Sequence, residues 1–270
     1  MNITSLGYRT DLMLLKLSGS QIEEVGDHLV VRTPHNPTFW WGNFLLYSRP
    51  PAPGEFEGWQ AEFQTAFPNA AHRTFGIDST SGEFGSVTSE IEAGGFEFAH
   101  NTVMTARPAD LKSPRAARLD ADYRSLSSDD DWAQALEVRL ACNDDIEAKS
   151  YRTYAERKMQ EARRLAEQGH GAWFGAFVTG QMKAGMGLYT DGSGAARFQS
   201  VETRFSARGQ GLASNLVYFV ARHGFAQMQA QTLVMVADPH YHAITLYRKL
   251  GFTDTETQLA LERPPPGERI

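Results

Sequence analysis

The stretch that decides the fold is Arg208-Gly209-Gln210-Gly211-Leu212-Ala213. It follows a strand-like run at 196–203 and leads into a helix-like run at 214–228. Glycines at a strand-to-helix turn let backbone N–H groups come close to an anion, and the dipole of the following helix favours negative charge. We therefore expect a ligand that carries phosphate at this turn.

The segments around this turn alternate between strand and helix patterns, with glycine-containing turns between neighbouring strands. The pattern predicts, in order, a strand at 123–126, helices at 132–140 and 147–168, strands at 171–178, 181–189 and 196–203, a helix at 208–228, a strand at 232–237, a helix at 240–250 and a last strand after Gly251-Phe252. The predicted order is thus β, α, α, three meandering strands, α, β, α, β.

Three consecutive acids, Asp129 to Asp131, directly precede the first of these helices. Consecutive acids point in different directions on a helix, which disfavours a shared metal ion. Acids at a helix N-terminus cap it and complement its dipole. We interpret Asp129 to Asp131 as a helix cap.

The N-terminal third is also mixed α/β. Strands are predicted at 28–33, 44–47, 73–78 and 96–106, an amphipathic helix at 56–67 and a weaker helix at 86–94, whereas the apolar run 12–17 fits strand or helix equally. Prolines and charged residues mark a connector at 107–122. We predict an N-terminal domain at 1–118 and a C-terminal domain at 119–270.

The composition of the chain limits the classes of binding partner and the cellular compartment that we expect. The formal charge of −6 gives no net attraction for nucleic acid or an anionic membrane, and it slightly favours a neutral or cationic substrate. Cys142 is the only cysteine, so an intrachain disulfide and a thiol-ligated metal site are excluded. Because no apolar stretch is long enough to cross a bilayer and no signal-peptide core is present, we predict a cytoplasmic protein.

A second segment, Ala243-Ile244-Thr245-Leu246-Tyr247-Arg248-Lys249-Leu250-Gly251-Phe252, completes a family pattern. Together with the element order, it resembles the "A…lYrklGF" box of the GCN5-related N-acetyltransferase (GNAT) superfamily. The family's coenzyme signature is Arg or Gln, two residues, Gly, one residue, then Gly or Ala. Arg208, Gly211 and Ala213 meet that signature, and the resemblance covers about residues 120–262.

The resemblance implies an α/β (α+β) fold of GNAT type, with a mixed, mostly antiparallel central sheet flanked by helices. The N-terminal third has no equivalent of the Arg208 signature. Two interpretations of it stay open: a degenerate second copy of the same fold, as in tandem members of the family, and an unrelated cap domain.

The resemblance also implies a function: transfer of an acetyl group from acetyl-CoA to a primary amine by direct attack in a ternary complex, without a metal. The residues it assigns to the coenzyme are Val201, Glu202, Thr203, Arg208, Gly209, Gln210, Gly211, Leu212, Ala213, Ser214, His240, Ala243 and Tyr247. Thr203 and Phe205 replace the Val and Pro that the family often has, and His240 replaces an Asn. The last change puts one contact to the pantetheine arm in doubt.

Tyr247 aligns with the tyrosine that protonates the departing thiolate in the family, and its phenol is a suitable acid at neutral pH. The alternative is an ordinary core tyrosine. Glu202 is the candidate general base, and its alternative is a strand residue that faces solvent or pairs with Arg197 or Arg204. Three further acids could shape the acceptor site: Asp144, Asp145 and Glu147.

Other functions fit the sequence less well. Gly209-x-Gly211-x-x-Ser214 nearly matches the dinucleotide-binding pattern, but it follows a meander and lacks the acid about 20 residues further on. A nucleotide-hydrolase loop would need Gly-Lys-Ser/Thr. A non-catalytic acyl-CoA-binding or sensor protein on the same fold stays open, as do the identity of the amine and the choice between monomer and homodimer.

Overall fold

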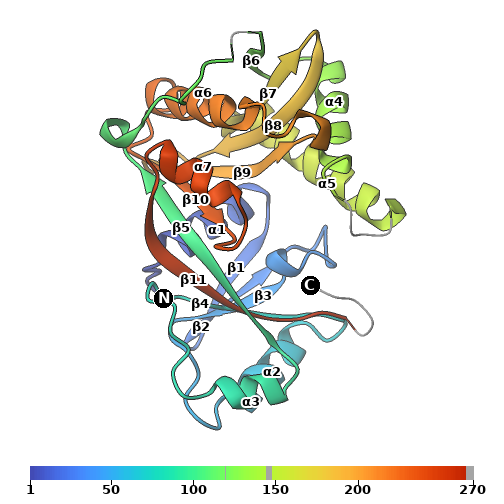
Figure 1. Cartoon of the computed structure of the whole chain (residues 1–270). Helices are drawn as coiled ribbons and strands as arrows, with labels where there is room; N and C mark the ends of the chain where they lie inside the picture. Colours follow the sequence, from blue (N-terminus) through green and yellow to red (C-terminus); the bar gives the residue numbers. More distant parts are fainter. Residues whose placement is uncertain (119, 144–147, 266–270) are drawn as a thin grey trace. The chain divides into compact units, whose positions relative to one another are not determined.

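The computed structural model describes residues 1–118, 120–143 and 148–265 (Figure 1). The chain forms two compact units and passes between them more than once. The first unit comprises Met1–Met104, Val236–His240 and the described chain from Asp254 onward, and the second comprises Thr105–Met235 and Tyr241–Thr253. This division differs from a single boundary at 118/119, because periodicity identifies a strand but not the strand it pairs with.

The first unit is a mixed sheet with helices on both faces. Its elements are α1 (Leu6–Leu17), β1 (Gln21–Val25), β2 (His28–Arg32), the short helix η1 (Trp40–Gly42), β3 (Phe44–Tyr47), α2 (Phe56–Ala66), β4 (Arg73–Ile77), α3 (Thr88–Ala93), β5 (Glu97–Ala106) and β11 (Thr253–Arg263). The strand order is β1-β2-β3-β4-β11-β5, with β3 and β4 parallel and β11 antiparallel to β4.

Alternation along β2 and β3 sorts apolar side chains onto the two faces of this sheet. Leu29, Val31 and Phe44 pack with Tyr8 and other residues of α1. The opposite face packs against the aromatic side of α2, where the cluster consists of Val30, Leu45, Tyr47, Phe56, Trp59, Phe63, Phe75, Ile77, Ile91 and their neighbours. The amphipathic helix predicted at 56–67 is thereby confirmed as α2.

The second unit has the same layered construction. Its elements are η2 (Pro108–Asp110), β6 (Asp122–Ser125), α4 (Asp129–Leu140), α5 (Ala148–Glu167), β7 (Gly171–Val178), β8 (Gln181–Tyr189), β9 (Ala195–Thr203), η3 (Phe205–Ala207), α6 (Leu212–Ala226), β10 (Thr232–Ala237) and α7 (Ala243–Lys249). The strand order is β10-β9-β8-β7-β6, antiparallel except for the β9–β10 pair. Helices α4 and α5 lie on one face and α6 on the other (Figure 1).

The two units repeat one topological sequence. In each, a three-stranded antiparallel meander is followed by a helix, a strand parallel to the third meander strand, and a short helix. The predicted mostly antiparallel α/β fold, with a second domain of related fold, is confirmed. The likeness escapes sequence comparison because it lies in the order and direction of elements.

The element predictions fail at a few places for identifiable reasons. Strand β1 was missed because its side chains are mostly exposed and polar, so no alternation marks it. Helix α6 begins at Leu212 and not at Arg208, because Gly209 and Gly211 have φ values of 71° and 80°. Helix α7 begins at Ala243, three residues later than predicted. The undecided run 12–17 is the end of helix α1.

The acidic segment at 129–131 caps α4 as predicted. Ser128 is the N-cap residue and accepts a hydrogen bond from the Asp131 N–H, while the Asp131 carboxylate accepts the N–H of Ser128. Arg124 on β6 adds a bidentate ion pair to Asp131, with both N–O distances at 2.7 Å. The cap therefore also fastens α4 to the edge strand.

Candidate functional site

Strands β9 and β10 separate along their length. Their parallel pairing joins Ala195–Arg197 of β9 to Thr232–Val234 of β10. Both strands are wholly described, and beyond these residues no further pairing joins them, although β9 continues to Thr203. The separation leaves the segment from Val201 to Thr203 without a β10 partner, and the Thr203 carbonyl oxygen there accepts a hydrogen bond from Arg208.

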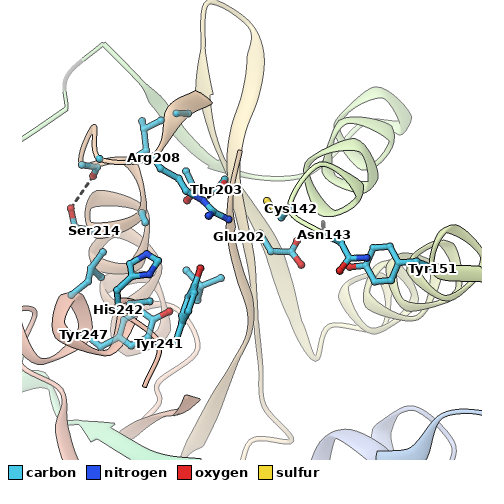
Figure 2. Close-up of a pocket in the computed structure, with 18 residues that line it drawn as sticks. Cys142, Asn143, Tyr151, Glu202, Thr203, Arg208, Ser214, Tyr241, His242 and Tyr247 are labelled. Atoms are coloured by element: carbon cyan, nitrogen blue, oxygen red, sulfur yellow. Dashed lines mark hydrogen bonds between the residues drawn. The ribbon is translucent and has the colours of Figure 1, made fainter. Parts of the chain in front are cut away.

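The turn after β9 presents backbone N–H groups at the open end of this separation. Gly211 is the N-cap of α6 in the left-handed conformation, and no side chain caps the helix. The first N–H groups of a helix have no partner within the helix. Leu212, Ala213 and Ser214 thus supply donors for an anion, and the Ser214 hydroxyl donates to the Gly211 carbonyl oxygen at 2.9 Å (Figure 2).

Arg208, the first residue of the signature, braces this turn. Its Nε donates to the Thr203 carbonyl oxygen at 3.1 Å, and its guanidinium lies 3.8 Å from the centre of the Phe205 ring. The side chain therefore ties the end of β9 to the short helix that follows. This geometry gives Phe205, which replaces the family's proline, a packing role.

A cavity of about 410 Å³ joins the strand separation to the turn. It is lined by Cys142, Asn143, Tyr151, Val201, Glu202, Thr203, Ala207, Arg208, Gly209, Gly211, Leu212, Ala213, Ser214, Tyr241, His242, Ala243, Leu246 and Tyr247. Figure 2 shows Ser214, His242 and Tyr247 toward one end, Asn143 and Tyr151 at the other, and Glu202 between them. A ligand bound on the turn would thus face Glu202.

Tyr247 lies on α7 at the wall of this cavity. The residue is buried, with 5% of its surface exposed, and its ring is 6.5 Å from that of Phe252. Burial raises the pKa of its phenol above the usual value, and Tyr241 adds to the shift. The phenol therefore stays protonated at neutral pH, which is the form that a proton donor to the departing thiolate needs.

Glu202 is largely buried at the middle of the cavity. Its side chain is 15% exposed, and its Oε1 accepts a hydrogen bond from Arg139 on α4 at 2.9 Å. Burial raises the pKa of this carboxyl to about 7, although Arg139 opposes the shift. A carboxyl with such a pKa exchanges protons readily near neutral pH. The ion pair foreseen with Arg197 or Arg204 is instead made with Arg139.

Most of the predicted coenzyme residues gather at this cavity. Those that line it are Val201, Glu202, Thr203, Arg208, Gly209, Gly211, Leu212, Ala213, Ser214, Ala243 and Tyr247. Gln210 and His240 do not line it: the Gln210 side chain donates to the Ser206 carbonyl oxygen, and His240 belongs to the first unit. The acids Asp144, Asp145 and Glu147 lie outside the described residues.

Several lining residues were not predicted. Cys142 and Tyr151 come from the α4–α5 region, and Tyr241, His242 and Leu246 come from around α7. Arg139 was also missed, although it shares the buried face of α4 with Ala135 and Val138. A charged residue on an otherwise apolar helix face was the available signal.

In the first unit, the strands that correspond to β9 and β10 are β3 and β4, and these two do not separate. Strand β3 pairs with β4 up to its last residue, Tyr47, and the Asp78 N–H donates to the Tyr47 carbonyl oxygen. The ring of Tyr47 stacks on Trp59 of α2 with 3.6 Å between ring centres. The turn before α2 contains Pro50, Pro51 and Pro53, which lack N–H groups. The described residues of this unit therefore offer no counterpart of the β9–β10 separation.

Within 1–118, 120–143 and 148–265, no group of three or more His, Cys, Asp or Glu side chains is arranged to hold a metal ion. Across those same residues, no helix is both long and apolar enough to span a bilayer.

Comparison with known proteins identifies the relatives of this site. A family model described as "Acetyltransferase (GNAT) family" matches residues 133–252, which include most of α4, all of α5 to α7 and every residue that lines the cavity. No curated protein matched the sequence.

Solved structures resemble the chain over nearly its whole length. A functionally unknown conserved protein from Staphylococcus epidermidis has a TM-score of 0.74 at 15% identity, covering 92% of this chain and 95% of its own. A GCN5-related N-acetyltransferase from Kribbella flavida has a TM-score of 0.68 at 14% identity, with 98% and 97% covered. A tandem GNAT protein from the clavulanic acid biosynthesis pathway has a TM-score of 0.59 at 14% identity, with 97% and 95% covered. At these identities the likeness shows the fold.

Proposed function

Residues 133–252 are a domain of the acetyltransferase (GNAT) family, and from this premise we propose that the chain transfers an acetyl group from acetyl-CoA to a primary amine. Membership of the family supports acyl-CoA-dependent acetyl transfer in general. The direct attack of the amine in a ternary complex is the specific part of the proposal.

One observation carries the proposal: the β9–β10 separation opens onto the N-terminus of α6 within a single cavity. A pyrophosphate bound at Gly211 to Ser214 would be held by backbone donors and the helix dipole. The pantetheine arm could then extend along β9 and form hydrogen bonds with the part of this strand that does not pair with β10. The acetyl group would reach the vicinity of Glu202 and Tyr247.

The proposed chemistry needs an amine that has lost its proton and a thiolate that gains one. Glu202 accepts a proton from the ammonium group, directly or through water, and the freed lone pair forms the C–N bond with the acetyl carbon. A backbone N–H of β9 polarises the carbonyl oxygen. As the C–S bond breaks, Tyr247 donates its proton to the thiolate sulfur. The nitrogen then loses its second proton to the Tyr247 phenolate, directly or through water, which restores the phenol, and Glu202 releases the first proton to solvent.

The binding step is tested by calorimetry with acetyl-CoA on the Gly211→Glu variant. A carboxylate at this N-cap would repel the pyrophosphate, so we expect binding to be lost. Gly192→Glu is the matched control, because Gly192 also has a positive φ (84°) and does not line the cavity. Normal affinity in the Gly211→Glu variant would overturn the assignment of the coenzyme site.

The transfer step is tested by release of free CoA thiol in the presence of a panel of primary amines. The panel includes peptide N-termini, lysine, polyamines, aminoglycosides and small metabolites. We expect release that depends on one of these amines. Tight binding of acetyl-CoA without release for any of them would favour a binding or sensor protein on the same fold.

A further inference from the structure

Arg139 is a buried cation that reaches from α4 to β9. The residue is 7% exposed, and its Nη1 donates to the Ser200 hydroxyl at 3.0 Å and to Glu202 Oε1 at 2.9 Å. Its Nε is buried without a hydrogen-bond partner among the described residues. Burying a charge with an unsatisfied N–H donor contributes little to the stability of the fold, so we looked to function for the reason that Arg139 is buried.

Ser200 lies at an irregularity of β9. Its φ is 48°, a left-handed value that is uncommon for a residue with a side chain. The β8–β9 register shifts here, since Gly185 faces Glu202 but Gly187 faces Gln199. The extra residue is a β-bulge, which re-aims the side chains that follow it. Such a conformation persists only where its surroundings hold it, and Arg139 bonds to Ser200 directly.

Glu202 follows the bulge by two residues and lines the cavity, whereas Arg139 does not line it. Arg139 engages Oε1, and Oε2 has no hydrogen-bond partner in the part of the chain that the structure describes. The carboxylate is therefore fixed on one oxygen and open on the other. This arrangement suits a group that must accept a proton from a ligand in the cavity.

The groups that face Glu202 come from several elements. They are Arg139 of α4, Cys142 just after it, Tyr151 of α5 and Arg208 of the turn, with Tyr154 of α5 beside Arg139 and Gly185 of β8 opposite Glu202 in the ladder. Arg139 is the only one of these that forms an ion pair with Glu202 among the described residues.

We propose that Arg139 is a positioning residue for the acetyl transfer: through Ser200 it holds the β9 bulge, and through Oε1 it orients Glu202 and favours its ionised form. This inference rests on the proposed function, in which Glu202 takes the proton of the amine. Arg139 itself touches neither the cavity nor the reacting atoms. The positive charge of Arg139 and the β9 bulge at Ser200 contribute to catalysis in different ways, and different variants test each of them.

The charge is tested with Arg139→Met, with Arg139→Lys as the conservative variant. The direct measurement is a carbon-13 NMR titration of the Glu202 carboxyl, assigned by its loss in Glu202→Gln. Removing an adjacent cation should move the midpoint upward by at least about one pH unit, and lysine should restore part of the change. An unchanged midpoint in Arg139→Met would overturn the proposal.

Kinetics give the second measurement. The ionised carboxyl is the active form, so kcat/KM should rise with pH through the Glu202 midpoint. In Arg139→Met this limb should move upward with the NMR midpoint, giving at least about five-fold lower kcat/KM near neutral pH, while affinity for acetyl-CoA stays near that of the wild type. A uniform loss of kcat/KM at every pH would indicate a structural role and contradict the proposal.

The bulge is tested with Ser200→Ala, which removes the hydroxyl but keeps the Arg139–Glu202 pair. We expect the NMR midpoint to stay and kcat to fall, because only the aim of the carboxylate changes. Ser200→Gly should retain more activity, since glycine adopts a positive φ freely. Equal activity of Ser200→Ala and the wild type would refute the role of the bulge.

Two further outcomes are distinguished by this design. If Arg139→Met does not fold, judged by circular dichroism, the titrations of Arg139→Lys and Ser200→Ala decide the question. If the wild type transfers acetyl to no amine, the proposed function fails, whereas the NMR titration still reports whether Arg139 controls Glu202.

Discussion

The side-chain amide of Asn215 donates a hydrogen bond to the Gly211 carbonyl oxygen at 2.9 Å and another to the Ala116 carbonyl oxygen at 3.0 Å. Its oxygen accepts the backbone N–H of Arg118 at 3.3 Å. Arg118 in turn donates to the Gln210 carbonyl oxygen at 2.6 Å. The glycine turn is therefore held from behind by the connector that precedes β6.

We expect the Asn215→Leu variant to bind acetyl-CoA about ten-fold more weakly, because one side chain that fixes the Gly211 turn is lost. It should also lower the free energy of unfolding by about 1–3 kcal/mol, since buried carbonyl and N–H groups lose their partner. Calorimetry and urea unfolding measure the two effects.

Asn43→Leu is the matched control for this prediction. Asn43 is a buried asparagine of the first unit that also donates to two backbone carbonyl oxygens, those of Asn36 and Phe39. Its loss should destabilise the protein comparably without weakening coenzyme binding. Equal affinities of the Asn215→Leu variant and the wild type would show that the turn is rigid without this amide.

Tyr247→Phe should lower kcat by about 100-fold, because the departing thiolate loses its proton donor. The affinity for acetyl-CoA should change little, since the ring remains. The pKa of Tyr247 is raised, so the phenol stays protonated across the assay range and should contribute no alkaline limb to the wild-type profile. Steady-state kinetics against pH measure both effects.

Tyr189→Phe provides the comparison, because Tyr189 is equally buried and its hydroxyl donates to the Ala162 carbonyl oxygen away from the cavity. Normal turnover in Tyr189→Phe would show that losing a buried tyrosine hydroxyl does not by itself lower kcat. The effect of Tyr247→Phe could then be assigned to the missing proton donor. Unchanged kcat in Tyr247→Phe would mean that the thiolate obtains its proton from another donor.

Asp131→Asn should lower the free energy of unfolding by about 1–3 kcal/mol near neutral pH, because the charged partner of Arg124 and of two backbone N–H groups is lost. The ion pair with Arg124 holds the pKa of Asp131 well below its usual value. A depressed pKa adds stability above the unfolded-state pKa near 3.8, and that stability is lost as the pH falls below it.

The difference in stability between the wild type and Asp131→Asn should therefore shrink as the pH falls below about 4. Urea unfolding at several pH values measures it. Asp130→Asn is the control, since Asp130 is exposed in the same first turn and accepts a hydrogen bond from the Gln134 side chain. A difference that is independent of pH would contradict the role given to the ionised carboxylate.

Local patterns predicted the second unit well because its strands and turns are coded by neighbouring residues. Strands β7, β8 and β10 have their predicted bounds, since each contains a run of consecutive buried residues and is ended by a clear turn. The Gly211 turn was found because a left-handed conformation at a helix start favours glycine. The fold of this unit was thus largely readable.

Relationships between distant residues were not readable. Arg139 and Glu202 are 63 positions apart, and nothing in either segment specifies the other as its partner. Strand β11 was predicted as a strand, but its pairing with β4 of the first unit depends on tertiary topology. The nature of the N-terminal third also required the structure, because its likeness to the second unit lies in strand order and direction.

The closure of the first unit leads to a last prediction: the chain should bind a single molecule of acetyl-CoA. Pairing of β3 with β4 continues to Tyr47, and the Tyr47–Trp59 stack fills the adjoining space, so no slot for pantetheine exists there. In the turn before α2, Glu55 accepts the Ala52 N–H at 2.8 Å and pairs with Arg49. An internal carboxylate thus occupies a donor that a phosphate would need.

Gly54→Glu, at a φ of 82° in this turn, tests the prediction. It should leave the stoichiometry and affinity of acetyl-CoA binding unchanged in calorimetry, whereas Gly211→Glu removes all binding. Two molecules bound per wild-type chain, or one lost in Gly54→Glu, would mean that the first unit also takes the coenzyme.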